Sequence, residues 1–168
     1  MKMMIKPTKI THSMLLDMAK RAKCDHERTI FLHYTWGAYG DIYDEFHLCI
    51  DKNGDIYRPL LNLDDRINDW GFLSDSMHIA LCCGKNLRYS NTGYQYDKQR
   101  RVLCGDYPTE LQIAQLAIVV AIICRGLEQE ICYRNVKTLY EHQFANIYRT
   151  HNEEISRDLM WLPHQEHS

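Results

Sequence analysis

Two segments of the chain carry apolar residues at helical spacing behind a residue suited to cap a helix. Between Met14 and Lys20 apolar positions recur every three or four residues, and Thr11 lies just before them. This pattern predicts a first helix. Residues 111–127 form a longer run that is apolar almost all round, with Thr109 as its cap. Such a helix offers little polar surface to water, so we expect it to pack across a sheet with little exposure.

Short apolar and β-prone runs, which predict buried strands, accompany these helices. The predicted strands are residues 29–33, 45–50, 55–58, 76–83 and 136–139. The second and third of them flank Asn53-Gly54, a dipeptide typical of a tight β-hairpin. Residues 85–106 are rich in polar and aromatic side chains and predict a long surface loop. Together the elements predict an α/β fold, with a central mixed sheet flanked by helices on its faces.

Length and charge narrow the choice of function. The 168 residues suit one domain, spanning 1–168, with a core of its own. The 20 basic and 22 acidic side chains nearly cancel, so the chain has no strong field for a polyanion and nucleic acid is not an expected partner. We expect a monomer.

Cysteine usage and the N-terminal segment bear on the compartment. The seven cysteines are odd in number, form no CxxC pair and lie in apolar runs, so we expect buried thiols in a reducing compartment. The first residues hold no apolar stretch of signal-peptide length, and nowhere do 18 apolar residues run together. We therefore expect synthesis in the cytoplasm without a signal peptide, and no membrane insertion.

His33 is the first candidate for chemistry, because it closes an apolar strand and precedes the polar and aromatic residues 34–37. This position suits a metal ligand at a loop mouth, and it equally suits a core histidine with one hydrogen bond. His142 follows the last predicted strand, and Asp158 adds a carboxylate near the C-terminus. Two histidines and one carboxylate leave an open position on a zinc ion, as a hydrolase requires.

Several landmarks, in this order and spacing, resemble one known family. They are Leu32-His33-Tyr34-Thr35, residues 46–57, Trp70-Gly71, residues 76–81, residues 107–112, His142, and Arg157-Asp158-Leu159 followed by Trp161. The pattern resembles the zinc-dependent N-acetylmuramoyl-L-alanine amidases, which include phage endolysins and share their fold with animal peptidoglycan recognition proteins. The resemblance runs from about residue 30 to residue 162.

The resemblance implies a site and a reaction. His33, His142 and Asp158 would hold one Zn²⁺ ion, and the reaction would be hydrolysis of the amide between N-acetylmuramic acid and L-alanine. The partner would be bacterial peptidoglycan or a muropeptide. The implied role is that of a phage or prophage endolysin, which waits in the cytoplasm and acts on the cell wall after the membrane is opened.

Three residues depart from the family pattern. Many members have a tyrosine where this chain has Phe46, a histidine where it has Asn68, and some have a glutamate where it has Ala80. These departures leave the general base or acid open. Glu45 is the first candidate for that role, although strand alternation would turn it away from the face of Phe46. Arg157, beside the expected ligand, could steady an oxyanion or be a solvated surface charge.

Other residues have more than one interpretation. Tyr34, Trp36 and Trp70 are candidates to bind substrate by stacking, and aromatic residues at loop mouths equally often pack. His47 is expected to make a structural hydrogen bond. His78 stands where the family usually has glycine, and we do not expect it to bind the metal.

Three other functions remain open at this stage. The domain could bind muropeptide without cleaving it, and Phe46, Asn68 and Ala80 favour that reading, whereas the three expected ligands favour catalysis. It could instead regulate another protein, as some phage amidases do. A purely structural zinc is the third alternative, and a three-ligand site with an open position argues against it.

Overall fold

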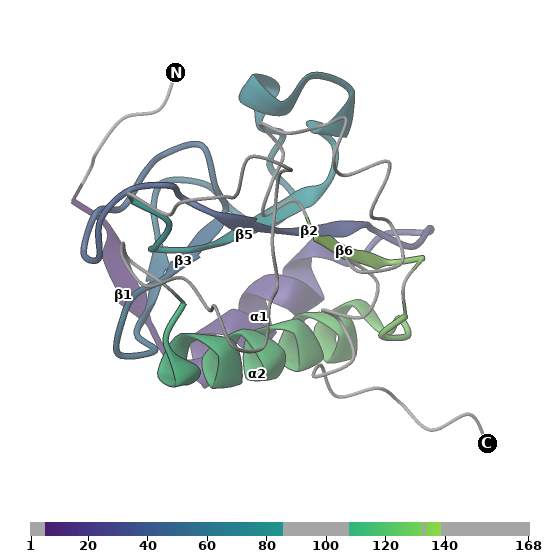
Figure 1. The fold of residues 1–168 in the computed structure, drawn as a ribbon. Helices are drawn as coiled ribbons and strands as arrows, with labels where there is room; N and C mark the ends of the chain where they lie inside the picture. Colours follow the sequence, from purple (N-terminus) through teal and green to yellow (C-terminus); the bar gives the residue numbers. More distant parts are fainter. Residues whose placement is uncertain (1–5, 86–107, 133, 139–168) are drawn as a thin grey trace.

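The computed structural model describes residues 6–85, 108–132 and 134–138 (Figure 1). Its six strands are β1 (Thr8–Ile10), β2 (Ile30–Tyr34), β3 (Leu48–Ile50), β4 (Ile56–Arg58), β5 (Met77–Leu81) and β6 (Val136–Thr138). They form one sheet in the order β1-β4-β3-β5-β2-β6. β5 is parallel to β2 and β3, β6 is parallel to β2, and β4 is antiparallel to β1 and β3. The predicted mixed sheet of α/β type is confirmed.

The predicted strands lie at the expected places in the sequence, but some of them are shorter than expected. All five predicted strands are present, but β3 begins three residues later than expected, at Leu48, and β5 ends at Leu81. β1 was not predicted, because its sequence, Thr8–Ile10, has only one buried position and its pairing with β4 is not a local feature. Most of the predicted loop 85–106 lies outside the described residues.

The Asn53-Gly54 hairpin is confirmed. The Gly54 amide donates to the Asp51 carbonyl over 2.8 Å, and the Asp51 amide donates to the Asp55 carbonyl over 2.9 Å. Gly54 has a φ of +85°, a conformation in which glycine avoids the strain of a side chain. The turn thereby brings β3 and β4 together as antiparallel neighbours.

Both described α-helices cover the same face of the sheet. α1 (His12–Ala22) and α2 (Glu110–Leu127) pack against one another and lie on one side of the strands in Figure 1. The opposite side is covered by loops that include the 3₁₀ helix η1 (Asn68–Leu73). The expectation of helices on both faces is therefore corrected for the part of the chain that the structure describes.

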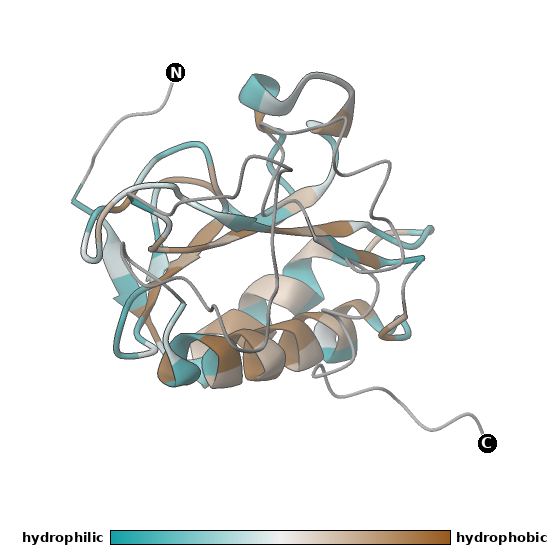
Figure 2. Cartoon of the chain, viewed as in Figure 1, coloured by the Kyte–Doolittle hydropathy of each residue, from teal (hydrophilic) through white to brown (hydrophobic). Residues whose placement is uncertain are grey.

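α2 is more exposed than its apolar sequence suggested. Its buried side chains recur along one face, while Leu111 and Ile118 are 59% and 43% exposed. Figure 2 shows apolar colour on much of this helix. The sequence pattern did not show which positions of α2 face the solvent. By length and composition alone α2 is the one described helix that could cross a membrane, a test that buried core helices also pass.

Alternation along β2 divides the interior into two parts. Ile30, Leu32 and Tyr34 join the large core beneath α1 and α2. On the other face lie Phe31 and His33, together with a smaller apolar cluster. That cluster consists of Ile42, Phe46, Cys49, Ala80 and Cys82.

No disulfide joins two of the six described cysteines, as predicted. Four of the six are buried, whereas Cys24 and Cys132 are half-buried, so the prediction of burial holds only in part. Burial raises the pKa of the Cys124 thiol to about 12, which keeps it protonated and unreactive.

Candidate functional site

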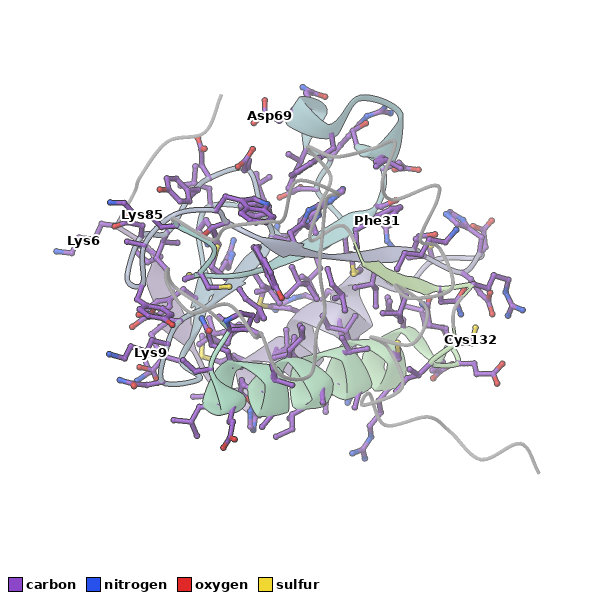
Figure 3. The ribbon with its side chains drawn as sticks, in the orientation of Figure 1. Lys6, Lys9, Phe31, Asp69, Lys85 and Cys132 are labelled. Atoms are coloured by element: carbon purple, nitrogen blue, oxygen red, sulfur yellow. The ribbon has the colours of Figure 1, made fainter. Side chains whose placement is uncertain are left out.

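His33 lies on β2, between β5 and the edge strand β6. It is fully buried on the sheet face away from the helices, and its partner in register on β5 is Ala80. Figure 3 places Phe31, two residues earlier on β2, and Asp69 of η1 on that same side of the sheet. The site is therefore covered by the loop that contains η1 rather than by a helix of the core.

Two further histidines lie beside His33, and the three form what we call the histidine cluster (His33, His47 and His78). His33 Nε2 and His78 Nδ1 are 2.8 Å apart. The backbone amide of His78 donates to His47 Nδ1 over 2.9 Å, and the His47 amide donates to the His78 carbonyl over 2.8 Å. All three side chains are fully buried. The predicted structural hydrogen bond of His47 is thereby observed.

Backbone carbonyls of the covering loop fix where the protons lie. His78 Nε2 donates to the Leu73 carbonyl over 2.9 Å, and His47 Nε2 donates to the Asp65 carbonyl over 2.6 Å. A carbonyl only accepts, so both Nε2 atoms carry hydrogen. Neutral His78 then accepts at Nδ1, which means that His33 donates from Nε2. The lone pair of neutral His33 consequently lies on Nδ1.

The same burial keeps His78 and His47 uncharged. Desolvation lowers the pKa of His78 to about 4, outweighing its hydrogen bond to the Leu73 carbonyl. Desolvation likewise lowers the pKa of His47, outweighing the hydrogen bond to Asp65. Both imidazoles are therefore neutral near pH 7, as the hydrogen-bond assignment requires.

Aromatic rings surround the cluster. The Trp70 ring is nearly parallel to His78, with 5.0 Å between ring centroids, and lies 4.4 Å from the His33 ring. Phe31 stacks on His78 at 5.5 Å, and Phe46 lies 5.2 Å from His33. These contacts hold the imidazoles in place and keep water away from them.

The three predicted substrate-binding aromatics have different surroundings. Tyr34 is only 4% exposed and belongs to the core beneath the helices, on the opposite face from His33, so its predicted substrate contact has no support here. Trp36 is half-buried at a φ of +60°, and its ring meets Tyr34 edge-on. Trp70 is half-buried against His33, which makes it the one of the three that lies at the site.

Glu45 lies next to the site for a reason the sequence did not show. It precedes β3, so the alternation argument against it does not apply at this position. Its carbonyl accepts a 2.8 Å hydrogen bond from Trp70 Nε1, and the next residue, Phe46, contacts His33. The backbone of Glu45 is thus held beside the cluster, and its carboxylate role stays a prediction.

The residues that depart from the family pattern also have defined places. Phe46 is buried against His33, and Ala80 is the neighbour of His33 in register. Asn68 is exposed at the start of η1. The positions at which the amidases that the sequence resembles carry a tyrosine hydroxyl and a glutamate therefore adjoin His33 and here carry neither group.

The remaining expected site residues, His142, Arg157 and Asp158, lie outside the described residues. Of the three expected metal ligands, His33 is the one that the structure describes. A zinc-binding histidine needs a lone pair on one nitrogen, and its other N–H is usually held by an acceptor. His33 meets both conditions, so its hydrogen bonding fits the expected metal.

A separate group of potential metal ligands lies at the surface. Donor atoms of Cys24, Asp25 and His26 all lie within 4.8 Å of one another. His26 Nδ1 is 2.9 Å from an Asp25 carboxylate oxygen, and this hydrogen bond holds the pKa of Asp25 below its usual value. Asp25 and His26 are exposed, and none of the three was predicted as a ligand.

Sequence reasoning missed the part that His78 plays. The sequence marks it only as a histidine at a position where the amidases that it resembles usually have glycine. Its contact with His33 depends on the register of β5 against β2, in which His78 pairs with Phe31 and so lies diagonal to His33. The alternation of side chains along β2 and β5 was the available signal for this contact. The register between the two strands, however, is not a local property of the sequence.

Comparison with protein-family models, with curated proteins and with solved structures found no match to this chain.

Proposed function

We propose that the protein is a zinc-dependent N-acetylmuramoyl-L-alanine amidase that hydrolyses bacterial peptidoglycan. One observation carries the proposal beyond the sequence resemblance. His33, the expected first ligand, is buried, and its Nε2–H is held by His78, so that the lone pair of the neutral imidazole lies on its second nitrogen.

The expected ligands are His33, His142 and Asp158. Zinc, when bound, would polarise the substrate carbonyl and lower the pKa of a bound water. In the overall reaction the water oxygen adds to the lactyl carbonyl carbon, the carbon–nitrogen bond breaks, and the nitrogen of L-alanine takes up a proton. The products are a lactyl carboxylate and a free L-alanine amino group.

Residues of the chain would supply the proton transfers and substrate contacts. Glu45 is the first candidate for general base, since its backbone is held beside His33 through Trp70 and Phe46. Arg157 is the candidate to steady negative charge on the carbonyl oxygen. Trp70, which is half-buried beside His33, is the candidate to contact the glycan or the stem peptide.

The proposed biological role is that of a phage or prophage endolysin. The enzyme would be made in the cytoplasm and would reach the wall once the membrane is opened. The near balance of basic and acidic side chains supports a carbohydrate and peptide substrate rather than a polyanion.

A muropeptide-binding module without turnover is the second candidate. Phe46 favours it, because this side chain lies against His33 at the position of the family's tyrosine and has no hydroxyl to offer a developing oxyanion. Ala80 favours it for a similar reason, since it is the neighbour of His33 in register and has no carboxylate.

The test measures release of L-alanine amino ends from purified peptidoglycan. It compares the protein with His33→Ala, with a chelated sample and with the same sample after zinc is restored. His12→Ala is the matched control, because His12 is an exposed histidine on α1, beyond the other face of the sheet.

Turnover that is lost in His33→Ala and on chelation, returns with zinc and persists in His12→Ala would support the amidase. Turnover that survives both treatments would overturn the metal site. No turnover in the parent protein, together with measurable muropeptide affinity, would favour the binding module.

A further inference from the structure

His78 lies where it can control the state of His33. It is on β5, beside β2, and its side chain shares a face with His33 because both alternate with the residues that point towards the helices. Its ring is fully buried between neighbouring strands and is nearly parallel to the rings of Phe31 and His47. Hydrogen bonds at both nitrogens fix the orientation of the packed ring.

The hydrogen bonds of His78 have a direction. The Leu73 carbonyl can only accept, so it takes the Nε2 hydrogen of His78. Nδ1 of the neutral ring is left as an acceptor, and His33 Nε2 lies 2.8 Å from it. The carbonyl of the covering loop thus decides which nitrogen of His33 carries the hydrogen, with His78 as the link.

The separation of the two rings argues that His78 is a partner of the ligand rather than a ligand. Two nitrogens bound to one tetrahedral zinc at about 2.0–2.1 Å would be about 3.3 Å apart. The observed 2.8 Å between His33 Nε2 and His78 Nδ1 is a hydrogen-bond distance. His78 also uses its other nitrogen on Leu73, so neither nitrogen is left for a metal.

We infer that His78 is a positioning residue, which holds His33 as the Nε2–H tautomer and so makes Nδ1 the nitrogen that binds zinc. The part of the inference that concerns zinc binding rests on the proposed function, whereas the part that concerns the tautomer of His33 does not. A glycine at this position would offer no acceptor, so His78 supplies an orienting hydrogen bond that the usual residue cannot. Loss of such a partner typically lowers metal affinity about 10–100-fold.

The first measurement is the tautomer of His33 in the metal-free protein. Long-range ¹H–¹⁵N spectra of ¹⁵N-histidine-labelled protein distinguish a protonated from an unprotonated ring nitrogen, and His33→Gln assigns the signal. We expect hydrogen on Nε2 and none on Nδ1. Hydrogen on Nδ1 would overturn the inference whatever the enzyme does.

The second measurement is zinc affinity, by competition with a chromophoric chelator, for the parent, His78→Ala and His78→Asn. Every protein carries His26→Gln, which removes a ligand from the exposed Cys24, Asp25 and His26 group. We expect His78→Ala to bind zinc about 10–100-fold more weakly, with His33 no longer in one tautomer. His78→Asn keeps an acceptor near the place of Nδ1 and should bind within about threefold of the parent.

The outcomes separate this inference from the proposed function. Unchanged zinc affinity in a folded His78→Ala would overturn the positioning role even if the parent is an amidase. His78→Ala could bind zinc more weakly and no longer hold His33 in one tautomer while the parent protein shows no amidase activity. That result would support the positioning role of His78 and count against the amidase. If His78→Ala fails to fold, the tautomer of the parent still tests the inference, and the zinc affinity of His78→Leu is compared with that of His78→Asn. Weaker zinc binding by His78→Leu, which has no acceptor, would support the positioning role, and equal binding would overturn it.

Discussion

At the residue scale, the positions of the imidazole hydrogens follow from partners that can only accept hydrogen bonds. The carbonyls of Leu73 and Asp65 orient His78 and His47, and His78 in turn orients His33. Both carbonyls belong to the loop that covers the sheet. The loop therefore does more than shield the site from water. Through His78, its backbone sets the tautomer of His33, to which these two carbonyls are not hydrogen bonded.

The hydroxyl missing at position 46 can be restored. On the proposed amidase function, Phe46→Tyr should raise the rate about tenfold or more, because Phe46 contacts His33 and one oxyanion donor is typically worth at least that much. The measurement is the initial rate of L-alanine end release at saturating zinc. Phe46→Leu, which is apolar and lacks the hydroxyl, is the control and should not gain. An unchanged rate in a folded, zinc-loaded Phe46→Tyr would show that the hydroxyl is not what limits turnover.

Buried neutral histidines make stability depend on pH. The pKa of His78 is about 4 in the folded protein, below the usual value of about 6.5 for an unfolded histidine. Between these values the unfolded chain binds more protons, so the free energy of unfolding should fall as the pH falls from about 6.5 towards 4. His78 would account for up to about 3 kcal/mol, and the lowered pKa of His47 acts in the same direction.

Urea unfolding of the metal-free protein between pH 7.5 and 4.5 measures this dependence. His78→Asn has no group to titrate at that position and should show a shallower fall than the parent. Equal slopes in the two proteins would contradict the assignment of the pH dependence to His78.

At the scale of elements, the sequence predicted local features such as caps and turns, but not contacts between residues far apart in the chain. Thr109 caps α2 as predicted, accepting from the Gln112 amide over 3.1 Å while the Gln112 side chain accepts from the Thr109 amide. The hydroxyl of Thr109 also donates to the Lys52 carbonyl, a contact with the hairpin that no sequence pattern announces. Caps and turns involve residues a few positions apart, whereas docking of a helix depends on the whole fold.

The same distinction holds for the candidate site. His33 could be singled out because a histidine at the end of an apolar strand is a local pattern, and the resemblance added its role. The contact with His78 needed the β2–β5 register, and the position of Trp70 needed the path of the loop through η1. β1 escaped prediction because its pairing with β4 joins segments far apart in the chain.

Contact between the two helices depends on a glycine. A Cβ added to Gly126 of α2 would lie 2.4 Å from the Cβ of Ala19 on α1 and 3.0 Å from the Lys20 amide nitrogen. Gly126→Ala should therefore destabilise the protein by about 1–3 kcal/mol, although alanine normally favours a helix by about 1 kcal/mol. Chemical denaturation measures the difference.

Two controls separate crowding from other effects of Gly126→Ala. Arg125→Ala changes the exposed neighbouring position on α2 and should alter stability by less than about 0.5 kcal/mol. Adding Ala19→Gly to Gly126→Ala removes the opposing Cβ and should recover part of the loss. A Gly126→Ala protein as stable as the parent would contradict the close helix contact.

For the whole molecule, the two faces of the sheet have different tasks. The helix-covered face holds the large apolar core, and the loop-covered face holds the buried polar cluster. Burying neutral imidazoles costs free energy unless their hydrogen bonds are made, and here the covering loop makes them. The larger apolar core thus lies on one face of the sheet, and the hydrogen-bonded histidine cluster lies on the other.

A metal held by His33, His142 and Asp158 would link β2 to the C-terminal part of the chain, so its effect should appear in global unfolding. Zinc at 100–1,000 times its Kd should stabilise the parent by about 3–4 kcal/mol, because only the folded chain would assemble the site. For a chain of this length that corresponds to a rise of roughly 6–16 °C in Tm over the chelated sample. His33→Ala should lose the rise, whereas His26→Gln, which alters the exposed cluster, should keep it. A zinc-dependent rise that persists in His33→Ala and disappears in His26→Gln would place the metal at the surface cluster instead, and would contradict the amidase proposal.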